Sequence, residues 1–171
     1  HGNKGAKNKT LLAKIHGQKA DLFYNQRLYD DALRELDEMK SLSEEMKDKE
    51  LYVNAYSFSS SILYKMQDYD SVIVVNNECY DILMSEFNDS VNAAIVLASS
   101  ISTYICKKDY DNARRLMPFY EEYSGHFDEY GNILKGKESY YIDKGDMYRG
   151  LDSLDSAETY YRKAICASDW N

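Results

Sequence analysis

Residues that interrupt helices are rare in this sequence. One proline and eight glycines occur in 171 positions, and these two residue types are the least compatible with a helix interior. Hydrophobic residues make up 44% of the chain and charged residues 29%, which is typical of a globular protein. We therefore expect an all-α fold with long helices, arranged as a single domain over residues 1–171.

Positive charge and long hydrophobic runs are also lacking. The chain has 21 Lys and Arg residues against 29 Asp and Glu residues, a net charge of −8. Such a surface repels phosphate groups, so nucleic acid and anionic membranes are not expected partners of this segment. The longest apolar window, Ala93 to Ala98, covers six residues, far fewer than a membrane helix needs. We expect no direct membrane insertion.

Motifs of catalysis and metal binding are missing. The sequence has no HExxH motif, no nucleophile elbow and no glycine-rich phosphate loop after a strand,. We expect His16 to be a packed, hydrogen-bonded helix residue. His126 has Asp128 and Glu129 beside it, but a metal site needs three or four converging ligands,. We expect no enzyme activity, no metal site and no cofactor.

Cysteine is scarce and widely spaced. Cys79, Cys106 and Cys166 lie too far apart for a CxxC metal or redox motif, and an odd count cannot pair completely within the chain,. Each occurs in a helical pattern among apolar neighbours. We expect three buried structural thiols, which leaves the compartment open.

The sequence does contain an internal repeat, clearest in residues 138–164. Aromatic and small residues alternate there in a fixed order: Tyr141, Gly145, Tyr148, Ala157, Tyr161 and Ala164. This order resembles the tetratricopeptide repeat, a pair of antiparallel helices. The resemblance implies a right-handed α-α superhelix, a solenoid similar to tetratricopeptide domains, of about four helical hairpins.

Three earlier segments repeat the pattern more loosely. The matching residues are Ala20, Phe23, Tyr29, Ala32, Leu36 and Met39 in the first, Tyr56, Ser60, Leu63 and Tyr69 in the second, and Leu97, Tyr104, Tyr110, Ala113 and Met117 in the third. The turn positions Tyr29, Tyr69, Tyr110 and Leu154 are 40, 41 and 44 residues apart, against about 34 in the family. The resulting repeat units are residues 8–46, 49–86, 89–124 and 132–168.

An aspartate follows each turn position. We expect Asp30, Asp70, Asp111 and Asp155 to cap the second helix of their hairpins,.

Three local features could disturb this arrangement. The β-branched run from Val72 to Val75 favours a strand by propensity, but its helical spacing of apolar residues predicts a helix,. Pro118 predicts a kink or an early end of its helix. The glycine-rich segment 125–137 predicts an irregular connection,.

The resemblance also implies a binding groove, lined by the first helix of each hairpin. The corresponding residues are Lys14, Asp21, Tyr24, Asn25, Asn54, Ser57, Ser61, Tyr64, Lys65, Ser102, Asp146 and Arg149, with Ala98, Ile105 and Ser139 beside them. This lining is polar and mixed in charge, which favours a protein or peptide partner over an apolar small molecule. Gly17 and Asp21 lack the cationic and amide groups with which some family members clamp a carboxylate,, so a chaperone-tail clamp is disfavoured.

Two functions remain open. Residues 144–165 resemble repeats of bacterial multidomain signalling and transcription regulators. That likeness implies a sensory or interaction segment of a longer protein, with a periplasmic location suspected and a cytoplasmic one as the alternative. The other hypothesis is a free-standing adaptor that mediates assembly without signalling. Association of copies through the repeat ends also stays open.

Overall fold

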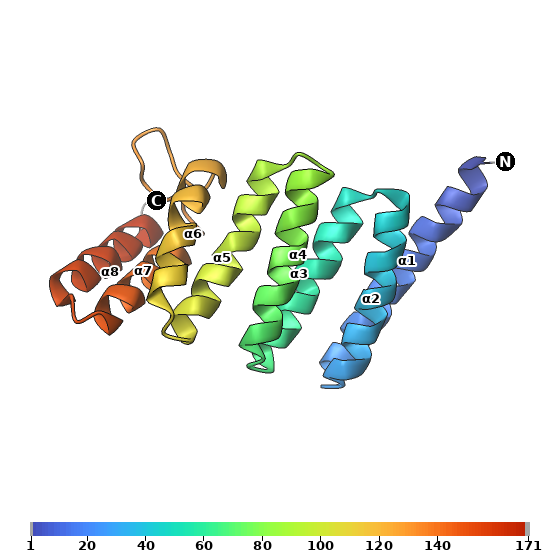
Figure 1. The fold of residues 1–171 in the computed structure, drawn as a ribbon, viewed down its shortest axis with the longest axis horizontal. Coiled ribbons are helices and arrows are strands. Elements are labelled where there is room, and N and C mark those ends of the chain that lie inside the picture. Colours follow the sequence, from blue (N-terminus) through green and yellow to red (C-terminus); the bar gives the residue numbers. More distant parts are fainter. Residues whose placement is uncertain (1, 170–171) are drawn as a thin grey trace. The chain divides into compact units, whose positions relative to one another are not determined.

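The computed structural model describes residues 2–169, which form eight α-helices in antiparallel pairs (Figure 1). They are α1 (Gly2–Asn25), α2 (Tyr29–Met46), α3 (Lys49–Lys65), α4 (Tyr69–Ser85), α5 (Ser90–Cys106), α6 (Tyr110–Tyr123), α7 (Ser139–Gly150) and α8 (Leu154–Asp169). The described residues contain no strand, only an isolated antiparallel bridge between Phe127 and Ile133. The expected all-α fold is confirmed. The chain divides into two compact units, residues 1–79 (unit 1) and 80–171 (unit 2), which are described separately.

The same turn joins the two helices of every pair. One non-glycine residue in each turn has a left-handed φ of 57–63°: Arg27, Gln67, Lys108 and Asp152. The next backbone amide donates to the carbonyl five residues back, as in Leu28 N to Phe23 O at 2.9 Å and Asp109 N to Tyr104 O at 2.8 Å. This pairing satisfies carbonyls at the end of the first helix. The second helix then begins at the turn positions that the sequence predicted.

The helix caps differ from the prediction. Asp48, Asp89 and Asp109 precede α3, α5 and α6, and each carboxylate accepts from the backbone amide three residues ahead. Asp68 accepts from Ser71 N in the same way before α4. The predicted caps, Asp30, Asp70, Asp111 and Asp155, instead lie within the first turn. They are inside the helix, where a carboxylate interacts with the helix dipole but does not cap.

Two of the three local features that could disturb the arrangement leave their helices continuous. Val72 to Val75 lie within α4, where Val72, Cys79 and Leu83 are buried along one face, so the helical spacing outweighs β propensity. Helix α6 continues through Pro118 to Tyr123, and Pro118 is exposed. An early end of the helix is therefore not observed. The expected irregular connection lies between α6 and α7.

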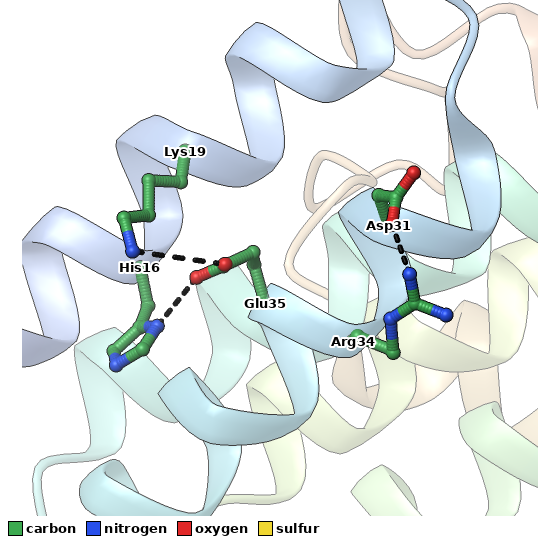
Figure 2. A network of polar contacts seen from close by, with 5 residues as sticks. All are labelled: His16, Lys19, Asp31, Arg34 and Glu35. Carbon is green, nitrogen blue, oxygen red and sulfur yellow. Dashed lines mark hydrogen bonds and ion pairs between the residues drawn. The ribbon is translucent and has the colours of Figure 1, made fainter.

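Small residues let the helices of unit 1 approach closely. Ala13 and Ala20 of α1 pack with Ala32 and Leu36 of α2, and all four are fully buried. A polar contact stands beside this core (Figure 2). Nδ1 of His16 lies 2.6 Å from Oε2 of Glu35. This confirms the prediction that His16 is a packed, hydrogen-bonded helix residue.

Aromatic side chains make up much of the core of unit 2. Tyr120, Tyr140 and Tyr141 are buried with Ile101 and Met147. The ring centroids of Tyr120 and Tyr140 are 4.6 Å apart, a distance at which aromatic pairs add stability beyond the buried area. These contacts attach α6 to α7.

The cysteines do not all follow the prediction. Cys79 is buried, and burial raises the pKa of its thiol to about 12. Cys106 and Cys166 are exposed, so the expectation of three buried thiols is wrong for these two. Both positions have apolar neighbours in the sequence, but they lie on the outer faces of α5 and α8.

Candidate functional site

The groove residues predicted in unit 1 lie on α1 and α3. Seven of the nine are exposed and two, Tyr24 and Tyr64, are partly buried. The structure brings Tyr24 and Lys65 together, although 41 positions separate them. Asn25 donates from Nδ2 to Oδ2 of Asp21 at 3.4 Å, and Tyr64 packs on Tyr69 with ring centroids 5.4 Å apart.

Lys65 forms the central contact of this group. Its Nζ donates to the Tyr24 hydroxyl at 3.2 Å and lies 4.8 Å from the centre of the Tyr24 ring. The hydrogen bond to Tyr24 raises the pKa of Lys65. The ammonium also lies 5.9 Å from the centre of the Tyr29 ring. Unit 1 therefore presents a cation that aromatic faces hold in place.

The remaining residues predicted in unit 1 do not join this group. Ser61 donates from its hydroxyl to the carbonyl of Ser57 at 2.9 Å, a contact within α3. Lys14 and Asn54 are exposed on α1 and α3, apart from the Tyr24 and Lys65 contact.

In unit 2, two of the predicted residues are tied to their own hairpin. Nη2 of Arg149 donates to Oδ1 of Asp146 at 2.9 Å, and the hydroxyl of Tyr161 donates to the same oxygen at 2.6 Å. Asp146 therefore connects α7 to α8. Asp146 lies on the face that was predicted to line the groove, but its hydrogen bonds to Arg149 and Tyr161 give it a structural role.

The third predicted residue of unit 2, Ser102, opens onto a hollow between α5 and α7. The hollow has a volume of about 260 Å³. Its lining consists of Ala98, Ser99 and Ser102 from α5, Tyr120 from α6, and Ser139, Tyr140 and Asp143 from α7. Three hydroxyl-bearing serines and one carboxylate therefore converge on one concave surface.

Asp143 is the ionisable group of this hollow that titrates nearest to neutral pH. The Ser102 hydroxyl donates to its Oδ1 at 3.3 Å. Burial raises the pKa of Asp143 to about 6, and the like charge of Asp146 acts in the same direction. Desolvation disfavours a carboxylate that is removed from water. The hollow thus contains a negative charge that is costly to keep.

The two tyrosines of the hollow have their hydroxyls directed to other groups. The hydroxyl of Tyr140 donates to Oε1 of Glu121 at 2.6 Å. The hydroxyl of Tyr120 lies 2.8 Å from Nδ1 of His126. Burial raises the pKa of Tyr120 to about 12. Both tyrosines therefore remain neutral at physiological pH and contribute mainly their rings to the lining.

The sequence-based prediction missed Asp143 and misplaced Ile105. Ile105 is buried in the core of unit 2, so it does not line a groove. Asp143 lies four residues after Ser139 and three before Asp146 on the same helix. That spacing places all three on one face, and it could have indicated Asp143.

A second hollow, of about 440 Å³, lies between the connection that follows α6 and the pair of α7 and α8. Its charges are mixed. Nζ of Lys144 donates to Oε1 of Glu121 at 2.6 Å and lies 4.8 Å from the ring centre of Tyr160. Because its lining contains both acidic residues (Glu121, Asp128 and Glu129) and lysines (Lys144 and Lys163), this hollow is not lined by charge of one sign as the first is.

Two negative findings concern membranes and metals. Among the residues that the structure describes, no helix is both long and apolar enough to cross a bilayer. Over the same residues, no group of three or more His, Cys, Asp or Glu side chains could hold a metal ion.

Comparison with solved structures identifies a similar fold. It resembles that of BtubC (BKLC) from P. vanneervenii. The TM-score is 0.72 at 15% sequence identity, and the alignment covers 95% of this chain and 67% of BtubC. At this identity the likeness concerns the helical-repeat fold alone. No protein-family model matches the sequence, and no curated protein matches it.

Proposed function

We propose that this chain is a tetratricopeptide-type scaffold that binds a protein or peptide segment on the exposed faces of its odd-numbered helices. The repeat pattern supports this assignment, because its turn positions coincide with the first residues of α2, α4, α6 and α8. The likeness to a helical-repeat structure agrees with it. Tetratricopeptide hairpins form surfaces of this kind from stacked helices.

The observation that carries the proposal is the hollow between α5 and α7. Peptides need partners for both backbone amides and carbonyls. The hydroxyls of Ser102 and Ser139 can serve either group, and Asp143 accepts from donors,. In unit 1, Tyr24 and Lys65 present a donor and an aromatic face on the corresponding helices. A polar, concave lining of this type suits an extended peptide better than an apolar small molecule.

A random-peptide phage library panned against the chain tests the proposal. Ser139 is exposed at the rim of the hollow, so Ser139→Trp should block the hollow without disturbing the core. We expect enriched synthetic peptides to bind the wild-type chain in calorimetry and to lose about tenfold or more in affinity for Ser139→Trp.

Thr159→Trp is the matched control, because Thr159 is an exposed residue of α8 outside the hollow. It should leave the affinity unchanged. If no peptide is enriched, or if Ser139→Trp binds as tightly as the wild type, the proposed binding face is wrong. Replacing both Tyr24 and Lys65 by Ala tests the contribution of unit 1 in the same assay.

We further propose that the scaffold is the sensory or interaction segment of a bacterial signalling or transcription regulator. The support is the resemblance of residues 144–165 to repeats of such proteins. A free-standing adaptor is the second candidate, favoured by the binding surface alone. The full-length gene product distinguishes them: a membrane span together with a kinase or helix-turn-helix region supports the regulator, and a chain of repeats alone supports the adaptor.

A further inference from the structure

We propose that the hollow between α5 and α7 binds the ammonium group of a lysine side chain from the partner peptide, with the Asp143 carboxylate as its counter-ion. This inference rests on the proposed peptide-binding function and names the chemical group that the hollow recognises. Three observations support it: the charges that line the hollow, the contacts of the neighbouring Lys144, and the hydrogen-bond acceptors that the hollow presents.

The lining has one anionic group and no cationic one. Of the seven lining residues, Asp143 carries a carboxylate and none is Lys, Arg or His. The neighbouring charge that acts on Asp143 is that of Asp146, which is also negative. An anionic ligand would be repelled. An apolar ligand would bury the carboxylate without compensation, which is costly.

The nearest lysine in the sequence, Lys144, is engaged elsewhere. Its side chain is only 14% exposed, and its Nζ donates to Glu121 at 2.6 Å. The same ammonium lies over the rings of Tyr140 and Tyr160, at 5.5 Å and 4.8 Å from their centres. Lys144 is therefore held at the second hollow and does not neutralise Asp143. A cation from the partner would offset part of the cost of keeping Asp143 charged away from water.

The geometry of the acceptors fits an ammonium. An ammonium offers three donors. Asp143 and the hydroxyls of Ser102 and Ser139 supply acceptors from two facing helices. The side chains of Tyr120 and Tyr140 complete the lining as walls beside the carboxylate. An arginine side chain binds a carboxylate best through both oxygens, and the Ser102 hydroxyl already donates to Oδ1 of Asp143, which favours the compact ammonium of lysine.

The test uses the peptides enriched by panning. They should contain lysine. Replacing that lysine with Nε-acetyl-lysine should lower the affinity for the wild-type chain by roughly tenfold or more. Asp143→Asn should cause a similar loss, and the two changes together should cost little more than either one. Acetylation of the peptide N-terminus should have no effect, which separates the side-chain ammonium from the terminal one.

Asp111→Asn is the matched control for overall charge, because Asp111 is exposed on α6 and does not line the hollow. It should leave the affinity within about twofold. Circular dichroism should show that both Asn variants keep their helices.

Two results would count against this inference in different ways. Enriched peptides that bind equally well after lysine acetylation or to Asp143→Asn would overturn the lysine site and leave the scaffold proposal standing. Failure to enrich any peptide, or unchanged binding to Ser139→Trp, would overturn both.

Discussion

Gly145 of α7 packs directly under the ring of Tyr161 of α8. A Cβ atom added to Gly145 would lie 2.6 Å from Cδ1 of that ring and 2.9 Å from Cζ. The ring has little freedom to move, because its hydroxyl donates to Asp146 at 2.6 Å. The small residue and the aromatic residue of the repeat pattern are therefore two sides of one close contact between helices.

The first prediction concerns this contact. Gly145→Ala should destabilise the chain by about 1–2 kcal/mol, since the overpacking penalty exceeds the gain in helix propensity. Urea unfolding followed by circular dichroism measures the loss. Gly5→Ala is the matched control: Gly5 is a helical glycine with nothing within 4 Å of its added Cβ, so it should be neutral or stabilising by up to about 1 kcal/mol.

A double-mutant cycle tests the proposed cause. In a Tyr161→Ala background the ring is gone, so Gly145→Ala should no longer be destabilising. An equal loss in both backgrounds would contradict the contact with Tyr161 as the reason.

The second prediction concerns pH. The pKa of Asp143 in the folded chain is about 6, above the ordinary value of about 4. The folded state therefore binds this proton more tightly than the unfolded state, and stability falls as pH rises through this window. Asp143→Asn removes the carboxylate. The wild type loses this contribution to stability over this pH range and the variant does not. The free energy of unfolding of Asp143→Asn minus that of the wild type should therefore grow by on the order of 1–2 kcal/mol between about pH 4 and pH 6.

Urea unfolding of both proteins across this pH range measures the difference. Parallel stability curves would show that Asp143 titrates alike in the folded and unfolded chains, which would contradict the desolvation argument. Above about pH 6 the difference should stay constant, because the carboxylate is then ionised in both states.

The third prediction concerns the contact between α1 and α2. Glu35 contacts two side chains of α1: its Oε2 accepts from Nδ1 of His16 at 2.6 Å, and its Oε1 lies 3.8 Å from Nζ of Lys19 as an ion pair (Figure 2). The Glu35 and His16 side chains are only 20% and 17% exposed. Glu35→Ala should cost about 1–2 kcal/mol, because it leaves a largely buried imidazole without its partner.

Arg34 provides the comparison on the same helix. It pairs with Asp31, but its side chain is 74% exposed, so Arg34→Ala should change stability by less than about 0.5 kcal/mol. Thermal unfolding in one buffer ranks the two variants. Equal losses would show that the His16 contact adds nothing beyond an ordinary surface pair.

The fourth prediction concerns the helix caps. Asp89 precedes α5 and accepts from Asn92 N at 3.0 Å. Asp89→Ala should cost about 1 kcal/mol, whereas Asp89→Asn, which keeps an acceptor, should cost only a few tenths. Asp111→Ala should also cost less than Asp89→Ala, because Asp111 lies within the first turn of α6 and does not precede it. If chemical denaturation shows a larger loss of stability for Asp111→Ala than for Asp89→Ala, Asp111 would act as a cap, as the sequence predicted.

The helices and their turns could be predicted because their causes are local. The turn positions Tyr29, Tyr69, Tyr110 and Leu154 are the first residues of four helices, and each turn depends on hydrogen bonds between residues five or fewer apart,. At two of the turns the capping aspartate lies two residues before the predicted one: Asp68 caps α4 and Asp109 caps α6. Before α2 the N-cap residue is Leu28, which makes no side-chain cap hydrogen bond, so only the backbone geometry decides whether an aspartate near a turn caps.

The candidate site could be predicted only in part. The resemblance to tetratricopeptide repeats implied groove positions at Ser102 and Ser139, and both line the hollow between α5 and α7. The same resemblance also implied Ile105, which is buried in the core of unit 2. How far each side chain is buried depends on how closely the neighbouring helix packs against it.

Sequence alone determined that this chain is helical and where its hairpins turn, because apolar spacing and turn hydrogen bonds involve residues close together in the chain. Tertiary structure decided which side chains meet. Lys65 reaches Tyr24, and Ser102 reaches Asp143, across 41 positions in each case. Such pairs depend on the packing of one helix against another. The same packing removes Asp143 from water, and no pattern of neighbouring residues in the sequence could have predicted that desolvation.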